Sequence, residues 1–506
     1  MSSLELSVFI AYSLLLLVLS FYGSHRIRMA YLHYRHKYRL PTPAGRFAEL
    51  PRVTIQLPMF NELCVAERII DAACALEYPR EKFEIQVLDD STDETQGIAR
   101  AAVERWKARG IDIVYVHRVN RQGFKAGALE HGLTSAKGEF VAVFDADFLP
   151  PANYLLRCIH HFTDPKVAVV QARWGHINRD HSLLTRAQAI FLDGHFMVEH
   201  SARSRSGRFF NFNGTAGMWR RAAIVDGGGW QHDTLTEDLD LSYRTQVRGW
   251  RFVFLPDVVA PAELPEDMNA FKAQQHRWAK GSIQVALKLW PMLRKAGLPP
   301  EQRKEAFFHL TANIAWVVMI PLSILLPVSC VVRVSHGWFE VLLVDLPFSV
   351  LATLSVMMFY AISQAEQGAS WWRRVKHLPF VMALGIGLSV NNARAVIEAL
   401  MGYETGFVRT PKAGVGGPTA GKASRGAYRA MATFQPLVEL ALAAYMTYGI
   451  AYLIEREVYY SIPFLVLFQV GFGYVALTSI YEGLRGTVVR WVRVFTPALG
   501  APPQAR

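Results

Sequence analysis

Hydrophobic and polar positions change their pattern about halfway along the chain. Between residues 50 and 265, short apolar runs alternate with longer stretches of helical periodicity. The short runs predict strands at 53–58, 83–90, 111–117, 139–147, 167–173 and 251–257. The longer stretches predict helices near 62–76, 92–108, 125–136, 151–162 and 183–203. This alternation favours an α/β domain with a Rossmann-like, mostly parallel sheet, which binds ligands at the carboxyl ends of its strands.

Long apolar runs flank this domain on both sides. Each is long enough to cross a bilayer, and they predict five membrane spans at 6–23, 307–334, 338–363, 433–454 and 459–481. A signal peptide at 6–23 is disfavoured, because no basic segment precedes it and no small-residue cleavage site follows. The basic residues at 26–39 predict that the α/β domain lies in the cytosol, with an outer N-terminus and a cytoplasmic C-terminus.

Three further segments differ in composition from the α/β domain and the predicted spans. Residues 267–298 are basic and amphipathic, which is typical of helices at a membrane surface. Residues 378–402 are apolar but have basic residues on both sides, which favours an interfacial or re-entrant segment over a full span. Residues 403–430 are rich in Gly, Ala, Lys and Arg and predict a mobile cytoplasmic loop. The expected regions are 1–49, 50–265, 266–300 and 301–506.

Charge and cysteine content exclude several classes of function. The net charge is +12, but the basic stretches border apolar runs, so a lipid surface or a phosphorylated substrate is favoured over nucleic acid. The four cysteines have no zinc-site spacing and are expected to be reduced structural thiols. No glycine-rich phosphate loop is present, so a phosphate-handling enzyme built from this chain would hold phosphate most simply through a metal.

Acidic residues follow two of the predicted strands. Asp145 and Asp147 come after the run FVAVF, where their carboxylates suit Mg2+ or Mn2+, although a solvated turn also fits. Asp89 and Asp90 end the run FEIQVL. One of them suits a nucleotide base or ribose, whereas the alternative is an Asx-turn followed by a helix cap at Ser91 or Thr92. Lys125 opens a predicted helix and suits an anion, although an exposed basic turn is the other interpretation.

Three more clusters carry candidate chemistry. Thr236-Glu237-Asp238 precedes an amphipathic helix, where Thr236 suits an N-cap and a carboxylate also suits a general base. In Gln274-x-x-Arg277-Trp278, the arginine suits a diphosphate and the tryptophan a sugar ring, whereas a membrane-interface pair also fits. The segment 211–217 is either an acceptor-site lining or a tight turn between a strand and a helix.

In this order, the clusters resemble a known series. The pattern D, DxD, TED and QxxRW, together with LPMFNE, LDDSTDET, FDADFLP and FNGTAGMWRR, is similar to processive family 2 glycosyltransferases. The likeness is to the cellulose synthase superfamily, and most to its cellulose-synthase-like mannan, glucomannan and glucan synthases. It covers residues 50–290 closely and the membrane part loosely. The resemblance implies a GT-A fold beside a transmembrane pore.

The resemblance also implies roles for individual residues. Asp89 or Asp90 would contact the nucleotide, and Lys125, Asp145, Gln274 and Arg277 would bind the diphosphate. Asp145 and Asp147 would hold the metal. Asp238 would be the base, and Glu237, Asn213 and Trp278 would contact the acceptor. The gating loop that closes over the nucleotide would include Phe407, Arg409, Thr410 and Lys412.

The resulting expectation is an inverting, processive β-glycosyltransferase of a bacterial inner membrane or its equivalent. The donor would be GDP-mannose or UDP-glucose. The product would be a β-linked glucan or mannan, with β-1,4 as the expected linkage, and it would be exported across the membrane. Asn313 and Trp316 are candidates for the channel lining, for which plain packing is an equal alternative. The rival function is transfer of one sugar to a membrane lipid at much the same site. A channel or scaffold with a degenerate domain is disfavoured, because no acidic motif residue is missing.

Overall fold

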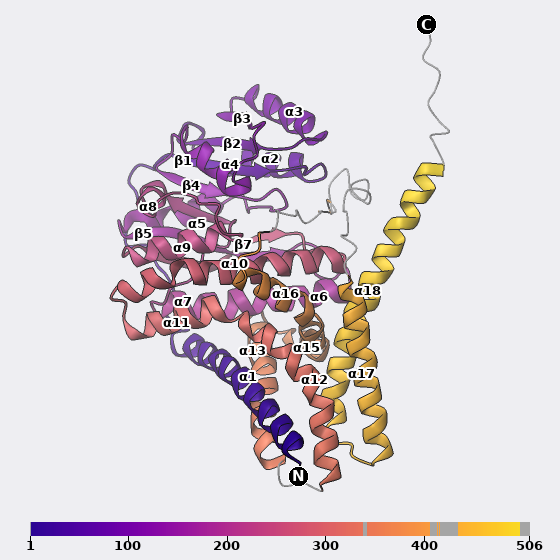
Figure 1. The fold of residues 1–506 in the computed structure, drawn as a ribbon. Coiled ribbons are helices and arrows are strands. Elements are labelled where there is room, and N and C mark those ends of the chain that lie inside the picture. Colours follow the sequence, from indigo (N-terminus) through magenta and orange to yellow (C-terminus); the bar gives the residue numbers. More distant parts are fainter. Residues whose placement is uncertain (1, 337–341, 405–411, 413, 415–433, 496–506) are drawn as a thin grey trace.

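The computed structural model describes residues 2–336, 342–404, 412, 414 and 434–495, with side chains described except at 334–335, 342–350 and 486–495. A sheet-containing domain lies above a group of long helices (Figure 1). The gating-loop residues Phe407, Arg409 and Thr410 lie outside the described residues.

A seven-stranded sheet forms the centre of the upper domain, in the order β3-β2-β1-β4-β6-β5-β7. The strands are β1 Val53–Met59, β2 Phe83–Asp89, β3 Ile113–His117, β4 Phe140–Val143, β5 Val167–His176, β6 Gly217–Arg220 and β7 Arg251–Ala262. Only β6 runs antiparallel to its neighbours β4 and β5. The six strands predicted from the sequence are confirmed, whereas the short strand β6 was not expected from it.

Helices cover both faces of the sheet, because alternate strand residues point to opposite sides. Val53, Ile55 and Leu57 of β1 pack on one side in a core shared with α2 Ala66–Cys74, α3 Thr95–Lys107 and α5 Tyr154–Ile159. Val141 and Val143 of β4 face the other core, which includes residues of α4 Phe124–Leu133, α8 Arg221–Asp226 and α9 Glu237–Val247. The short 3-10 helices η1 Arg80–Lys82 and η2 His160–Thr163 complete the connections.

The predicted helix 183–203 is one continuous stretch with an irregular middle. It consists of α6 Leu183–Asp193, the π-helix η3 Gly194–His200 and α7 Ser201–Arg205. Ser182 caps its start, because its hydroxyl accepts a hydrogen bond from the Thr185 amide at 3.1 Å. The π-helical turn is not apparent in the apolar spacing of the sequence.

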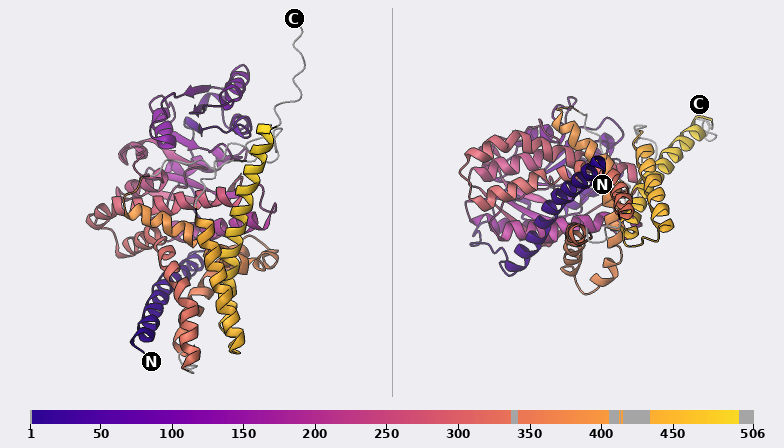
Figure 2. Two further views of the ribbon diagram at one scale, coloured as in Figure 1. Left: turned by 45° about the vertical axis from the view of Figure 1, so that its right-hand side comes forward. Right: turned by 60° about the horizontal axis from the view of Figure 1, so that its bottom comes forward.

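The remaining helices form the junction and the long lower bundle. They are α1 Ser3–Arg35, α10 Met268–Lys295, α11 Pro300–Thr311, α12 Ile314–Ser335, α13 Leu342–Ala365, α14 Trp371–Val375, α15 Leu378–Gly387, α16 Ser389–Leu400, α17 Gln435–Glu455 and α18 Ile462–Phe495. The left view of Figure 2 shows α1, α12 and α17 extending below the sheet domain. The predicted span 307–334 is in fact divided between α11 and α12, so its long helix begins at Ile314.

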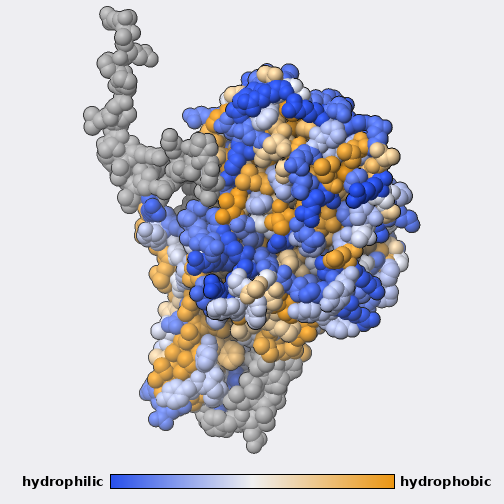
Figure 3. All heavy atoms as spheres, turned by 180° about the vertical axis from the view of Figure 1, so that it is seen from behind, coloured by the Kyte–Doolittle hydropathy of each residue, from blue (hydrophilic) through white to orange (hydrophobic). Residues whose placement is uncertain are grey.

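Four helices within the described residues are long and apolar enough to cross a membrane, namely α1, α12, α17 and α18. Hydrophobic residues gather on the surface of this lower part (Figure 3). On the spanning helices, Leu14 of α1 is 57% exposed and Leu437 of α17 is 63% exposed. The fifth predicted span corresponds to α13, whose first side chains lie outside the described set. Helices α15 and α16 meet at a bend of 42°, a geometry that suits either a broken span or a re-entrant segment.

Ion pairs attach α10 to the bundle. Lys272 Nζ lies 2.7 Å from Glu439 of α17, and both side chains are buried. Lys280 Nζ and His276 Nε2 each lie 3.1 Å from Glu398 of α16. Because breaking a buried ion pair leaves an uncompensated charge, at a cost of about 3–5 kcal/mol, these contacts hold α10 in one position between the sheet domain and the helices below it.

Candidate active site

The carboxyl ends of β1, β2, β3 and β4 meet at one edge of the sheet, because these strands are parallel. Asp89 is the last residue of β2, and Asp145 and Asp147 follow the end of β4. The acidic residues predicted at strand ends therefore lie on the same edge of the domain.

Asp89 and Asp90, at the end of β2, each make hydrogen bonds with neighbouring residues of the protein. Asp89 accepts hydrogen bonds from Tyr115 Oη at 2.7 Å and from the Ser91 amide at 2.8 Å. The bond to Ser91 forms the Asx-turn considered from the sequence, but the predicted cap at Ser91 or Thr92 is wrong, because α3 begins only at Thr95. Asp90 is held by the Nε and Nη2 atoms of Arg118, at 2.8 and 2.5 Å.

Arg118 connects this acidic pair to the start of α4. Its Nη2 atom also donates to the Phe124 carbonyl oxygen at 2.9 Å. The next residue is Lys125, whose Nζ donates to Asp145 Oδ1 at 2.5 Å and to the Gly214 carbonyl oxygen at 3.0 Å. The chain of contacts therefore runs from the end of β2 to the end of β4 and on to the loop before β6.

Asp238 lies against the same loop. Gly214 has a φ of +80°, and a Cβ atom added there would lie 3.0 Å from Asp238 Oδ2 and 3.4 Å from Lys125 Nζ. Glycine at this position therefore suits both the backbone conformation and the close approach of the two side chains. Lys125, Asp145 and Asp238, which are far apart in the sequence, meet at one point.

Burial and neighbouring charges shift the pKa values of Lys125, Asp145 and Asp238. Burial, followed by the nearby Glu237 carboxylate, raises the pKa of Asp238 to about 7, although the Lys125 ammonium acts in the opposite direction. Burial also raises the pKa of Asp145, which Lys125 offsets only in part. Burial would lower the pKa of Lys125, but Asp145, Glu237 and Asp238 outweigh it and raise the pKa above its ordinary value. Lys125 therefore stays charged among the carboxylates.

The donor set suits a divalent cation that also binds phosphate. Asp145 and Asp147 offer carboxylate oxygens at the sheet edge, and each now contacts an ammonium group, Lys125 for the first and Lys412 for the second. Within the described ranges, no three His, Cys, Asp or Glu side chains come together as a metal cage. One or two carboxylates completed by phosphate oxygens is the usual environment of Mg2+, so the residues present fit such an ion.

Helix α10 brings the last predicted cluster to the site. A Cβ atom added to Gly281 would lie 2.5 Å from Thr236 Cγ2, so α10 packs directly against the residue before Glu237. Thr236 occupies the N-cap position of α9 as predicted, but its side chain makes no capping hydrogen bond. Gln274 and Trp278 line the cavity described below, and the charge of Arg277 acts on Glu237.

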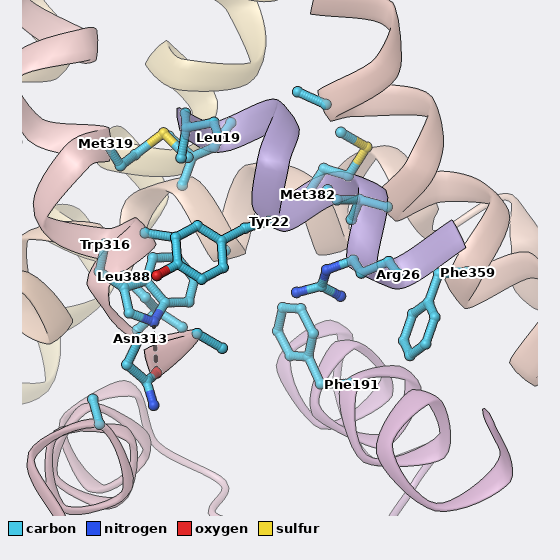
Figure 4. Close-up of a pocket in the computed structure, with 18 of the residues that line it drawn as sticks. Leu19, Tyr22, Arg26, Phe191, Asn313, Trp316, Met319, Phe359, Met382 and Leu388 are labelled. Atoms are coloured by element: carbon cyan, nitrogen blue, oxygen red, sulfur yellow. Dashed lines mark hydrogen bonds between the residues drawn. The ribbon is translucent and has the colours of Figure 1, made fainter. Parts of the chain in front are cut away.

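A cavity of about 660 Å³ begins at Asp238 and continues among the helices of the lower bundle. Its upper wall includes the side chains of Asn213, Gln274, Trp278, His195, Glu199 and Trp174. Tyr22, Arg26, Phe191, Trp316 and Phe359 line the middle (Figure 4), where Trp316 Nε1 donates to Asn313 Oδ1 at 3.0 Å. Farther along, the lining becomes mostly apolar, with Leu16, Met319, Leu322, Leu326, Cys330 and Phe464.

Comparison with known proteins identifies the upper domain. A family model described as glycosyltransferase like family 2 matches residues 51–281. Residues 51–281 are therefore similar to the family 2 glycosyltransferases. A solved structure with a similar fold is the mannosyltransferase PcManGT from Pyrobaculum calidifontis, in complex with GDP-Man and Mn2+. It is 21% identical with a TM-score of 0.54 over 78% of this chain and 100% of that one. The predicted GT-A fold is confirmed.

Two plant proteins are similar to a little more than half of this chain. The chain is 41% identical over 295 residues to the probable glucomannan 4-beta-mannosyltransferase 7 of Oryza sativa subsp. japonica, covering 55% of this chain and 50% of that protein. It is 43% identical over 296 residues to the glucomannan 4-beta-mannosyltransferase 2 of Arabidopsis thaliana, covering 55% of each. The chain thus matches about half the length of these relatives, and the resemblance to cellulose-synthase-like mannan synthases is confirmed.

One described residue of the predicted gating loop contacts the glycosyltransferase domain. Lys412 Nζ lies 2.6 Å from Asp147 Oδ2 and 3.4 Å from the Glu263 carbonyl oxygen. The Gly414 amide donates to Glu263 Oε2 at 3.1 Å, and Glu263 also pairs with Arg68 at 2.8 Å. The loop and the metal-ligating candidate Asp147 therefore meet directly.

Several polar residues of the glycosyltransferase domain were not singled out from the sequence. Tyr115 and Arg118 hold Asp89 and Asp90, and His195 and Glu199 line the cavity next to Asn213. The sequence did contain a pattern that indicates His195 and Glu199. Together with Arg203 they recur every four residues within a predicted helix, so their side chains share one helix face. The role of Arg118 depends on a contact between two strand ends, which residue spacing does not encode.

Proposed function

We propose that the protein is a membrane-embedded, inverting β-glycosyltransferase that adds mannose from GDP-mannose to a growing β-linked polysaccharide. The observation that carries this proposal is the meeting of Lys125, Asp145 and Asp238 at the head of a cavity that continues among apolar helices. A binding site for a charged donor and a path for a long neutral product thus share one entrance.

The choice of donor follows from the similar proteins. Two relatives are named as glucomannan 4-beta-mannosyltransferases, and the archaeal structure of similar fold holds GDP-Man with Mn2+. UDP-glucose is the second donor to consider, because glucan synthases belong to the same superfamily. A β-1,4 linkage and processive extension are part of the proposal.

The residues at the site have distinct roles in this reaction. Asp238 takes the proton from the acceptor hydroxyl while that oxygen attacks the anomeric carbon and the nucleoside diphosphate departs. Lys125, Arg277 and Gln274 bind the diphosphate, and Asp89 or Asp90 contacts the nucleoside. Trp278, Asn213 and Glu237 orient the acceptor. Direct displacement inverts the anomeric centre, so an α-linked donor gives a β-linked product.

Asp145 and Asp147 would hold Mn2+ or Mg2+ together with the donor diphosphate. When bound, the cation supplies neutralisation of the charge that develops on the leaving group. Lys412 lies against Asp147 and thereby couples the loop to this position. Phe407, Arg409 and Thr410 complete the proposed gating loop.

The cavity is proposed as the route by which the product leaves. Its aromatic lining at Tyr22, Trp316 and Trp174 offers apolar faces to sugar rings. The glycosyltransferase domain would lie on the cytosolic side of a bacterial inner membrane or its equivalent. The polysaccharide product would then pass between α1, α12 and α18 to the other side of the membrane. The membrane would also supply the lipid environment of these helices.

The test is purified protein in lipid nanodiscs with a panel of nucleotide sugars and Mn2+. We expect release of GDP from GDP-mannose, and a radiolabelled product that is long and is degraded by a β-mannanase. Turnover of UDP-glucose alone would reassign the donor. A single labelled sugar on lipid would replace polymer synthesis with glycolipid synthesis, and no turnover of any donor would overturn the proposal.

Transfer is expected to depend on pH through Asp238. The pKa of this carboxyl is raised to about 7, so the basic form is present above pH 7 and is lost as the pH falls through that value. We expect kcat/KM to decrease about tenfold per pH unit well below 7, because a protonated carboxyl cannot accept the proton. The residual activity of an Asp238→Asn variant serves as control and should lack this inflection. A flat profile down to pH 5 would contradict the assignment of the base.

The packing of α10 against Thr236 gives a second prediction. Substitution Gly281→Ala places a methyl group 2.5 Å from Thr236 Cγ2 and must move α10 away from α9. We expect transfer to decrease about tenfold or more, because misplacement of reacting groups by about 1 Å has effects of this size. The control is Gly97→Ala on α3, where an added Cβ meets nothing within 4 Å. Normal transfer by the Gly281→Ala protein would show that this contact does not set the geometry.

A further inference from the structure

The π-helical turn η3 places a group of polar side chains beside the proposed base. Its residues His195 and Glu199 line the same cavity as Asp238, Asn213 and Trp278. Their side chains remain partly accessible, with 26% of His195 and 21% of Glu199 exposed. Single π-helical turns within longer helices are rare and occur frequently at functional sites. This turn therefore needs an explanation beyond packing.

A hydrogen-bond network fixes the state of these residues. The Asn213 Nδ2 group donates to His195 Nε2 at 3.0 Å, so the proton of His195 is on Nδ1 and is donated to Glu199 Oε2 at 3.1 Å. His200 Nε2 donates to Asn213 Oδ1 at 2.8 Å. The amide of Asn213 is therefore held from both sides, and its orientation depends on the π-helical turn.

Glu199 is held as a carboxylate. Burial would raise the pKa of Glu199, but Arg203 and then His195 outweigh it and lower the pKa well below its ordinary value. Both of these neighbours bind the Oε2 atom, with Arg203 Nη1 at 3.4 Å. The Oε1 atom receives no hydrogen bond from any residue that the structure describes, and it belongs to a side chain that lines the cavity. This oxygen is therefore a hydrogen-bond acceptor in the cavity wall that a ligand hydroxyl can use.

We infer that Glu199, oriented by His195, is an acceptor-specificity residue that binds a hydroxyl group of the terminal sugar of the growing chain. This inference rests on the proposed function and deepens it. The ligand class is a hexose unit whose hydroxyl donates to Glu199 Oε1 while the ring lies beside Trp278. The donor, held at Lys125 and Asp145, is not contacted by this pair.

The experiment uses short β-linked manno-oligosaccharides whose terminal sugar lacks one hydroxyl in turn, at C2, C3 or C6. We expect the wild-type protein to discriminate against one of these acceptors by about 10- to 100-fold in kcat/KM, because a site that hydrogen-bonds a hydroxyl rejects an analogue lacking it. The variant Glu199→Gln should lose most of that discrimination. The affinity for GDP, measured by titration, should be the same in both proteins, because the donor site does not include Glu199.

Two further variants make the result decisive. Glu199→Asp keeps the charge on a shorter side chain and should retain part of the discrimination, which also covers the case in which the Gln variant does not fold. Glu104→Gln, on the exposed surface of α3, is the matched control. Full discrimination in Glu199→Gln, or a loss of GDP affinity in parallel with transfer, would overturn the inference. Absence of donor turnover in the wild-type protein would instead remove the proposed function, and the inference with it.

Discussion

An Asp238→Asn protein is expected to bind nucleotide normally and to transfer sugar at least about 100-fold more slowly than the wild type. The amide keeps the shape of the carboxyl and can still accept from the Leu239 amide, which now lies 2.8 Å from Asp238 Oδ1. It cannot take a proton from the acceptor hydroxyl. The measurement is initial-rate kinetics with GDP-mannose, beside a binding titration with GDP.

The matched control for this substitution is Asp233→Asn. Asp233 is an exposed carboxylate just before α9 that pairs with Lys288 at 2.6 Å. Its loss should leave transfer within about twofold of normal, since exposed ion pairs contribute little. Near-normal transfer by Asp238→Asn would remove Asp238 as the base, whereas loss of GDP binding would show that the substitution disturbs the donor site instead.

Removal of divalent cations is expected to abolish transfer. Treatment with EDTA followed by dialysis should eliminate measurable turnover, and Mn2+ or Mg2+ should restore it, because the carboxylates of Asp145 and Asp147 would otherwise repel the donor diphosphate. A second measurement, independent of activity, is Mn2+ binding by electron paramagnetic resonance with and without GDP. We expect GDP to tighten Mn2+ binding.

Variants of the two aspartates separate the cation from general charge effects. Asp147→Asn should weaken Mn2+ binding while leaving the Lys125–Asp145 contact intact. Asp112→Asn is the control, because Asp112 pairs with Arg52 and Lys137 on the exposed surface. Full activity in the chelator would contradict the metal role of Asp145 and Asp147, as would unchanged Mn2+ binding by Asp147→Asn.

Much of the fold follows from the sequence pattern. Strands such as Val53–Met59 and Phe83–Asp89 appear as short runs in which apolar residues recur at every second position, and the chain forms them where predicted. The strand Gly217–Arg220 was missed because it is short and begins at a glycine within a turn-like segment. Its antiparallel pairing with β4 and β5 depends on contacts distant in the sequence.

The site was predictable in its composition and less so in its arrangement. The acidic motifs identified Asp145 and Asp238, but only the structure places Lys125 between them. The pairing of Asp90 with Arg118 and the π-helical turn that carries Glu199 depend on tertiary contacts. Residue spacing indicates which side chains share a strand end or helix face, whereas it does not indicate which loop will lie opposite.

The anomeric configuration of the product tests the central claim most directly. Purified protein would be supplied with α-linked GDP-mannose labelled with 13C at C1, and the one-bond carbon–hydrogen coupling of the new linkage would be measured by NMR. Displacement assisted by Asp238 predicts a β linkage throughout the product. An α-linked product would contradict the account, because it would require a covalent or retaining mechanism for which this arrangement of Lys125, Asp145 and Asp238 provides no role.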